Sequence, residues 1–110
     1  MGGFMKGDVV VLSFPFSDLS GVKRRPALVL ADLEGNDIIL CQITTISKRD
    51  IYAIQIEDED FTKGKLKTKS ILRPNKIFTA DKNLILYTAC TISNEKVDET
   101  IQALFNIMNV

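Results

Sequence analysis

The sequence predicts a mainly β fold that ends in a single helix. Short apolar segments alternate with clusters of turn-forming residues along most of the chain, which is typical of strands joined by turns. Near the C-terminus the apolar residues change to helical spacing, at Val97, Ile101, Leu104, Phe105 and Met108. A chain of 110 residues, 45% of them apolar, is expected to form one domain with one core, residues 1–110.

The first two strands are expected on either side of a polar loop. Residues 8–14 are β-branched and apolar and predict a strand, whereas residues 15–23 are rich in turn formers. Pro26 favours an extended backbone at Arg25, so a second strand is expected to open there and to continue to Ala31.

The rest of the chain predicts shorter strands and the helix. Turn residues at 34–37 separate the second strand from the next one. A helical turn is expected near Phe78, and Ser93 is a suitable N-cap for the C-terminal helix. The further strands are expected at residues 38–45, 51–56, 70–73 and 84–89.

The sequence also bears on the cellular location of the protein. No apolar run approaches the ~20 residues of a membrane span, and the N-terminus lacks a signal-peptide pattern. We therefore expect a cytoplasmic protein without membrane contact, whose cysteines, Cys41 and Cys90, are reduced core residues.

The charge is balanced overall but segregated along the chain. The formal net charge is zero, which counts against a basic surface over the whole domain of the kind that binds nucleic acid. Residues 57–60 are all acidic, whereas residues 63–82 carry seven basic side chains and one acidic one, Asp81. Two interpretations remain open: a local patch that attracts phosphate, or solvated loops whose charges pair.

The alternating lysines of the basic segment also allow two interpretations. If the backbone is extended, they face one side and could follow a nucleic-acid backbone. Protection of an edge strand from aggregation is the more common use of such lysines, and we favour it. The residues concerned are Lys63, Lys65, Lys67 and Lys69.

The residue types that are missing narrow the possible chemistry. The chain has no histidine, which excludes a Ser-His-Asp triad and His-ligated metal sites. No nucleotide-cradling glycine motif occurs, so we expect neither a cofactor nor a metal. RNA cleavage remains possible, because the 2′-OH of RNA is a built-in nucleophile and a guanidinium can stabilise the charge on the phosphate.

A series of short motifs resembles the MazF/PemK family of bacterial toxins, the RNA-cutting halves of type II toxin–antitoxin pairs. The motifs are Gly7-Asp8 before a strand, Arg25-Pro26 opening the next strand, and Thr44 ending the third. The resemblance runs from about Lys6 to the C-terminus. It implies a small SH3-like barrel with a C-terminal helix. It also implies a homodimer, a cognate antitoxin partner, and metal-independent cleavage of single-stranded RNA to a 2′,3′-cyclic phosphate.

The resemblance also implies which residues act. Arg25 and Thr44 correspond to the family's catalytic pair. Strand alternation agrees for Thr44, since Leu40, Gln42 and Thr44 should share one face of their strand. Further candidates for RNA binding are Lys23, Arg24, Gln42, Thr45, Arg73, Lys76 and Phe16.

The chain departs from one branch of this family. Some plasmid-borne members have an Arg at the position of Arg73 followed two residues later by an Asp, and they use a His in the first loop. Here the second position is Asn75 and there is no His, so no residue is assigned as the general base. The alternatives are a non-catalytic toxin that binds its target, like related gyrase poisons, and a degenerate, RNA-binding barrel.

Overall fold

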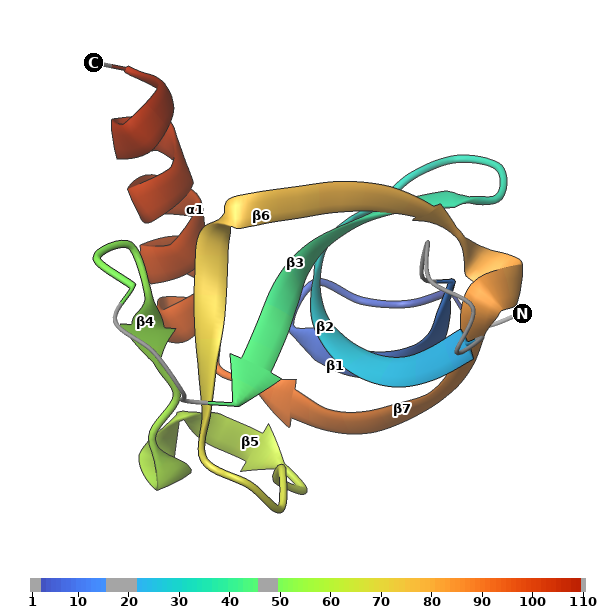
Figure 1. The fold of residues 1–110 in the computed structure, drawn as a ribbon, viewed down its shortest axis with the longest axis horizontal. Helices are drawn as coiled ribbons and strands as arrows, with labels where there is room; N and C mark the ends of the chain where they lie inside the picture. Colours follow the sequence, from blue (N-terminus) through green and yellow to red (C-terminus); the bar gives the residue numbers. More distant parts are fainter. Residues whose placement is uncertain (1–2, 16–21, 46–49, 110) are drawn as a thin grey trace.

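The computed structural model, which describes residues 3–15, 22–45 and 50–109, is a strongly curled antiparallel sheet with one helix beside it (Figure 1). The sheet has seven strands in the order β4-β6-β3-β2-β1-β7-β5. The strands are β1 (Asp8–Pro15), β2 (Val22–Asp32), β3 (Asp37–Thr45), β4 (Ile54–Gln55), β5 (Phe61–Lys63), β6 (Ser70–Asp81) and β7 (Ile85–Ile92). Two short 3-10 helices, η1 (Asp58–Asp60) and η2 (Lys82–Leu84), precede β5 and β7, and helix α1 (Asn94–Met108) follows β7. The predicted small, mainly β barrel with a C-terminal helix is confirmed.

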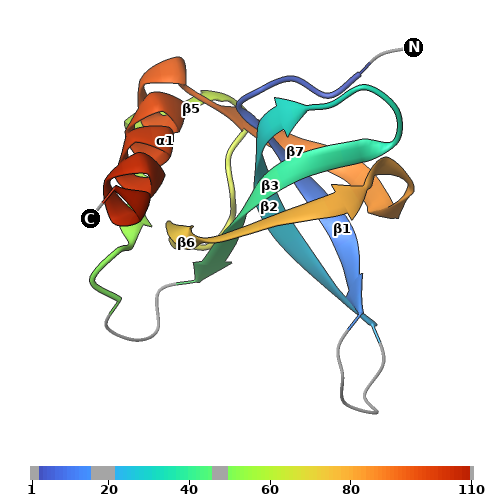
Figure 2. The same cartoon turned by 90° about the horizontal axis from the view of Figure 1, so that it is seen from above.

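Apolar side chains fill both faces of the central strands. One core cluster includes Val9, Leu28 and Cys41 together with Val97 of α1, so α1 packs on this face. The other, hereafter the inner cluster, includes Val10 and Leu40 and lies on the opposite face of the same strands. Figure 2 shows α1 standing to one side of the curled sheet. Because both faces are buried, the strands are nearly continuous apolar runs.

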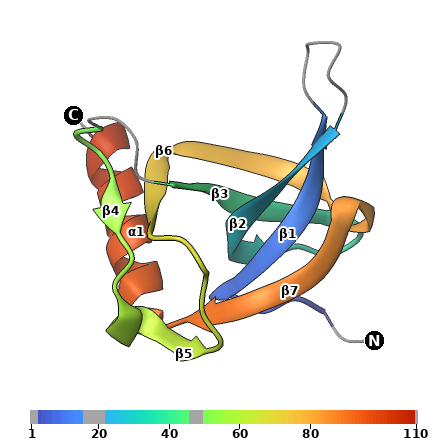
Figure 3. The same cartoon turned by 60° about the horizontal axis from the view of Figure 1, so that its bottom comes forward.

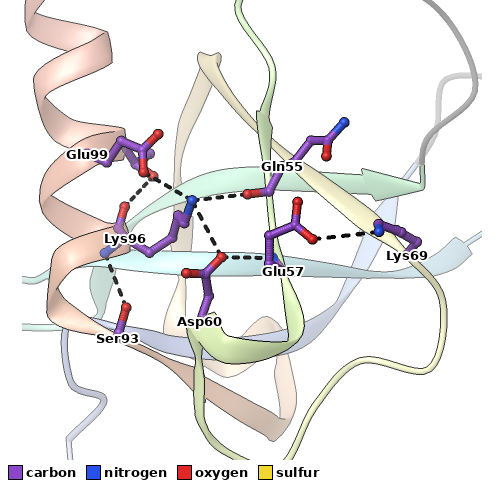
Figure 4. A network of polar contacts seen from close by, with 8 residues as sticks. Gln55, Glu57, Asp60, Lys69, Ser93, Lys96 and Glu99 are labelled. Atoms are coloured by element: carbon purple, nitrogen blue, oxygen red, sulfur yellow. Dashed lines mark hydrogen bonds and ion pairs between the residues drawn. The ribbon is translucent and has the colours of Figure 1, made fainter.

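A network of polar contacts fixes the N-terminal half of α1 (Figure 4). Ser93 caps the helix as predicted, its Oγ accepting a hydrogen bond from the Lys96 N–H at 3.3 Å. The Lys96 ammonium lies 3.4 Å from Asp60 and 3.0 Å from Glu99, and it donates to the backbone oxygen of Gln55 at 3.1 Å. These contacts join α1 to β4 and η1.

The C-terminal half of α1 is less covered. Val97 is fully buried, but Phe105 and Met108 of the predicted apolar stripe are 58% and 75% exposed. On another side of this end, Ile51 and Tyr52 are also exposed and line a shallow depression with Ala103, Asn106 and Ile107 of the helix. The helix therefore leaves an uncovered apolar surface.

The predicted break between a strand at 70–73 and a helical turn near Phe78 is wrong. Strand β6 continues through Phe78, which pairs with Leu40 and packs on the inner cluster. The register with β3 shifts between Cys41, opposite Ile77, and Gln42, opposite Arg73. Residues 74–76 thus form a bulge that bends the strand, and this bulge contains the proline and polar residues that resemble a turn. The helical turn is η2, directly after the strand.

Two other predicted segments are shorter than expected. The strand predicted at 51–56 is reduced to β4, because residues 51–52 form a turn in which the Tyr52 N–H donates to Asp50 at 2.9 Å. Of the alternating lysines only Lys63 lies in a strand. The edge-strand interpretation is therefore wrong for Lys65, Lys67 and Lys69.

Part of the segregated charge pairs locally. Lys65 lies 3.6 Å from Asp58, and Lys69 lies 3.6 Å from Glu57. These are contacts between largely exposed side chains, which stabilise a fold only weakly. They agree with the interpretation of two solvated loops with opposite charges.

Both cysteines are buried free thiols, as expected. Burial raises the pKa of Cys41 to about 12 and that of Cys90 to about 11, so neither forms a thiolate near neutral pH. The described part of the chain contains no helix with the length and apolar character needed to traverse a bilayer.

Candidate active site

The central feature of the site is a split in the sheet, hereafter called the wedge, between the ends of β2 and β3. In the described residues, pairing between these strands ends at Ala27 and Gln42. Beyond this point β2 stays with β1 as far as Val22, and β3 stays with β6 as far as Thr45. Figure 2 shows the two pairs of strands diverging. Pro26 is the first residue past the last pair, and it has no N–H to give to a neighbouring strand.

A pocket of about 400 Å³ occupies the wedge. One wall is the basic start of β2, Lys23 to Pro26, and the other is the end of β3, Ile43 to Thr45, with Ser70 of β6 beside it. No acidic residue lines the pocket within the described ranges. The wedge is therefore a locally positive site on a protein of zero net charge.

Arg25 and Thr44, the predicted catalytic pair, come together in this pocket. Continuing the β2–β3 register by two residues from Ala27 and Gln42 places Arg25 opposite Thr44. Both residues are half-buried, and the Nε atom of Arg25 is buried. A guanidinium held in a partly desolvated position interacts more strongly with a phosphate than one in open water does.

The alternation predicted for β3 is confirmed. Leu40 lies in the inner core cluster, whereas Cys41 and Ile43 lie in the cluster beneath α1. Gln42 and Thr44, half-buried at the end of the strand, therefore continue the face of Leu40 past the edge of the inner core.

The remaining predicted RNA-binding residues fall into separate groups. Lys23, Arg24 and Thr45 are exposed and line the wedge. Gln42 and Arg73 lie outside the pocket but pair with each other across β3 and β6. Lys76 is exposed in the bulge of β6, and Phe16 lies outside the described residues.

A carboxylate that the sequence did not single out contacts Arg73. The Nε atom of Arg73 donates to Oδ2 of Asp50 at 2.8 Å, and both side chains are largely buried. The Tyr52 N–H, followed by Arg73, lowers the pKa of Asp50 below its ordinary value. Asp50 is therefore a firmly ionised partner for Arg73 and a weak base.

The carboxylate beside Arg73 comes from a different part of the chain than the sequence comparison suggested. The sequence directed attention to the position two residues after Arg73, but the carboxylate that contacts Arg73 lies 23 residues before it. A local signal was present, since Asp followed two residues later by a turn N–H is the pattern of an Asx turn. That pattern reveals the turn and gives no information about the contact with Arg73.

The described ranges contain no group of three or more His, Cys, Asp or Glu side chains that could hold a metal ion.

Solved structures of similar fold cover almost the whole chain. A MazE–MazF complex from Deinococcus radiodurans matches with a TM-score of 0.79 and 16% identity, over 100% of this chain and 99% of that one. An endoribonuclease from a Mycobacterial species matches with a TM-score of 0.73 and 14% identity, over 100% and 95%. The Mycobacterium tuberculosis toxin MazF-mt6 matches with a TM-score of 0.67 and 14% identity, over 92% and 97%. At these identities the likeness establishes a shared fold.

Comparison with curated proteins finds no match to the chain. The model of one family, described as PemK-like, MazF-like toxin of type II toxin-antitoxin system, matches residues 5–108. Because this match spans nearly the whole sequence and agrees with the fold, the chain belongs to the PemK-like, MazF-like family of type II toxins.

Proposed function

We propose that this protein is an endoribonuclease that cuts single-stranded RNA in the wedge without a metal ion. The observation that carries the proposal is the meeting of Arg25 and Thr44 in a pocket whose charged lining is entirely basic within the described ranges. Family membership and the shared fold with proteins described as endoribonucleases support it.

In the proposed reaction the RNA supplies its own nucleophile. The 2′-oxygen attacks the adjacent phosphorus, the bond from phosphorus to the 5′-oxygen breaks, and a 2′,3′-cyclic phosphate and a 5′-hydroxyl result. The 2′-OH proton passes to solvent, and the departing 5′-oxygen takes a proton from solvent. Asp50 is unsuited to accept the first proton because its pKa is lowered.

Arg25 and Thr44 stabilise the charge that builds on the phosphate during this step. The guanidinium of Arg25 offers several N–H donors to the non-bridging oxygens. The hydroxyl of Thr44, on the opposite side of the wedge, donates one more hydrogen bond. Donors that are already in place when the charge develops stabilise a transition state without reorganisation.

Arg73 supplies a further phosphate contact in this scheme. Its Nε bonds Asp50, which fixes the plane of the guanidinium and leaves the terminal N–H groups for a ligand. Because Arg73 pairs across the sheet with Gln42, two residues from Thr44 on the same face of β3, this contact lies beside the cleavage site.

The proposal includes two protein partners. A cognate antitoxin with an acidic segment would suit the basic wedge and the basic residues 63–82, and a solved relative is a MazE–MazF complex. A second copy of the chain would suit the uncovered apolar surface near the end of α1. A cytoplasmic location follows from this role.

The test is incubation of mixed single-stranded RNA with the protein in EDTA, followed by sequencing of the ends. We expect discrete cuts with cyclic phosphate ends, a rate loss of roughly 100- to 1000-fold in Arg25→Ala, and normal cutting in Lys6→Ala, which removes an exposed cation elsewhere. A substrate with deoxyribose at the cut position should resist. Cleavage of that substrate at an unchanged rate would refute the mechanism.

Growth assays separate catalysis from simple binding. If the Arg25→Ala, Thr44→Ala double variant folds and still arrests growth, the protein acts by binding a target and the ribonuclease proposal is wrong.

A further inference from the structure

A second groove, of about 590 Å³, continues from the wedge. The two hollows share Arg24, Pro26, Thr45 and Ser70 in their walls. From there the groove passes over Val11 of β1 to residues 87–89 of β7. Its opposite wall is the segment between β5 and β6, which Figure 3 shows running across the gap between β7 and β6. A strand lying in the wedge can therefore extend into this groove.

The wall formed by residues 64–69 is held against the sheet. Gly64 has φ +62, and a Cβ there would lie 3.1 Å from the backbone oxygen of Ala89. Glycine thus lets the chain turn back tightly along β7. Leu66 packs against the core cluster beneath α1, and the Ser70 hydroxyl donates to the Thr68 backbone oxygen at 2.8 Å.

This anchoring leaves Lys65 and Lys67 exposed on either side of Leu66. With Arg24 they place three cations around the groove, and no acidic residue lines it within the described ranges. Of the three, Lys65 also lies 3.6 Å from the exposed carboxylate of Asp58, in the neighbouring depression. That depression, which shares Lys65 and Lys67 with the groove, is different, because the acidic residues 57–59 line it as well. The groove that joins the wedge is therefore the one suited to an anion.

The floor of the groove suits a flat, apolar group. Tyr87, which pairs with Val11 across β1 and β7, is 51% exposed there. Pro26 and Ala89 add apolar surface next to it. An aromatic ring beside cations is the arrangement with which proteins bind single-stranded nucleic acid, since the base stacks and the phosphate meets the positive charge.

We infer that this groove binds a nucleotide that flanks the cleaved one on the same RNA strand, with its base against Tyr87 and its phosphate near Lys65 and Lys67. The inference rests on the proposed function for the strand that occupies the wedge. Because every base has a face on which to stack, the contact adds affinity and positions the strand without selecting one base.

The test measures binding of short, fluorescent single-stranded 2′-O-methyl oligonucleotides, which cannot undergo internal attack, by anisotropy. Tyr87→Ala is expected to weaken binding roughly 5- to 150-fold, which is the effect of removing one stacked base. Tyr87→Phe keeps the ring and should bind like the original protein. Leu86→Ala is the matched control, since Leu86 is a 45% exposed neighbour on the same strand.

An abasic scan of a defined oligonucleotide localises the stacking site. At one position, removal of the base should weaken binding to the original protein and leave binding to Tyr87→Ala unchanged. Replacing Lys65 and Lys67 with Ala should reduce the slope of log affinity against log salt by roughly 0.7, because the one phosphate near them is no longer neutralised.

The outcomes distinguish this inference from the proposed catalysis. If the protein cuts RNA through Arg25 but Tyr87→Ala binds as tightly as before, the groove inference is wrong and the ribonuclease stands. If Tyr87→Ala loses affinity in a protein that cuts nothing, the groove inference stands and the catalytic proposal falls. Equal losses of RNA affinity in Leu86→Ala and Tyr87→Ala would also overturn the inference. So would a Tyr87→Ala variant that binds RNA normally but loses affinity for an acidic peptide, because the groove would then bind protein.

Discussion

At the scale of single residues, the site consists of cations held by different means. Arg25 is half-buried at the wall of the wedge, whereas Arg73 is oriented by Asp50. The two arginines therefore depend on different neighbours, and the contribution of Arg73 can be reduced without altering the wedge itself.

Asp50→Asn is expected to weaken RNA binding roughly fivefold, the equivalent of about 1 kcal/mol for a partly shielded charged hydrogen bond. The amide removes the negative charge that holds Arg73, and the guanidinium then samples more orientations. Because the pKa of Asp50 lies below its ordinary value of 3.8, its effect should be constant from pH 5 upward. Titrations of RNA into the original protein and into Asp50→Asn at pH 5 and pH 7 measure the loss of affinity and whether it changes with pH.

The control for Asp50→Asn is Asp98→Asn, on an exposed position of α1. Identical affinity in Asp50→Asn and the original protein would show that Asp50 does not position Arg73.

At the scale of elements, the sequence was informative where the pattern is local. The strands around Val10, Leu28 and Leu40 and the helix capped by Ser93 lie where their apolar spacing predicts them. The long strand β6 was missed because Pro74 and its polar neighbours resemble a turn, and only the register with β3 shows that they form a bulge. Strand pairing is non-local, so periodicity alone cannot locate such a shift.

The candidate site was predictable to a similar extent. The positions of Arg25 and Thr44 followed from a resemblance in order and spacing, and both line the wedge. Their catalytic roles stay predictions. The contact of Asp50 with Arg73, and the approach of residues 64–69 to Tyr87, join segments far apart in the chain. No spacing rule within a single sequence indicates such contacts.

The partly buried ammonium of Lys96 joins helix α1 to η1 and β4, which gives a prediction at this scale. Lys96→Met would leave Asp60 and Glu99 without their ammonium partner and should lower the free energy of unfolding by about 2 kcal/mol. Lys6→Met, at an exposed site, should have little effect. Urea unfolding of the two variants measures the difference, and equal stabilities would show that the network does not stabilise the fold.

The pH dependence of this difference has a definite sign. Desolvation opposes the charge on Lys96, but Glu99 and Asp60 outweigh it and raise the pKa above the ordinary 10.5. A raised lysine pKa gives a contribution that is fully present below the unfolded pKa and is lost as pH rises through the folded one. The gap between Lys96→Met and the original protein should therefore be constant from pH 7 to 9 and shrink above about pH 10.5.

At the scale of the whole molecule, the uncovered apolar surface beside α1 predicts self-association. Phe105 and Met108, three residues apart on one face of the helix, are both substantially exposed, and water-exposed apolar side chains of this kind are typical of interfaces. We expect a dimer by analytical ultracentrifugation, and a monomer for Phe105→Glu combined with Met108→Glu.

Leu33→Glu is the control for this experiment, because Leu33 is 38% exposed on the distant turn between β2 and β3. A monomeric original protein, or a dimer that survives the double substitution with its stability unchanged, would exclude this surface as the interface.

The split between β2 and β3 has a mechanical consequence. Because the ladder of strand pairs stops at Ala27 and Gln42 in the described residues, the width of the wedge is set by side chains and not by backbone hydrogen bonds. Widening the gap there breaks no pairing between β2 and β3, so the strand pair β1–β2 can move relative to the strand pair β3–β6 about the last β2–β3 pair. An RNA strand bound by Arg25 of β2 and Thr44 of β3 would bridge these two strands where they do not pair. Substrate binding and closure of the barrel would then be one event.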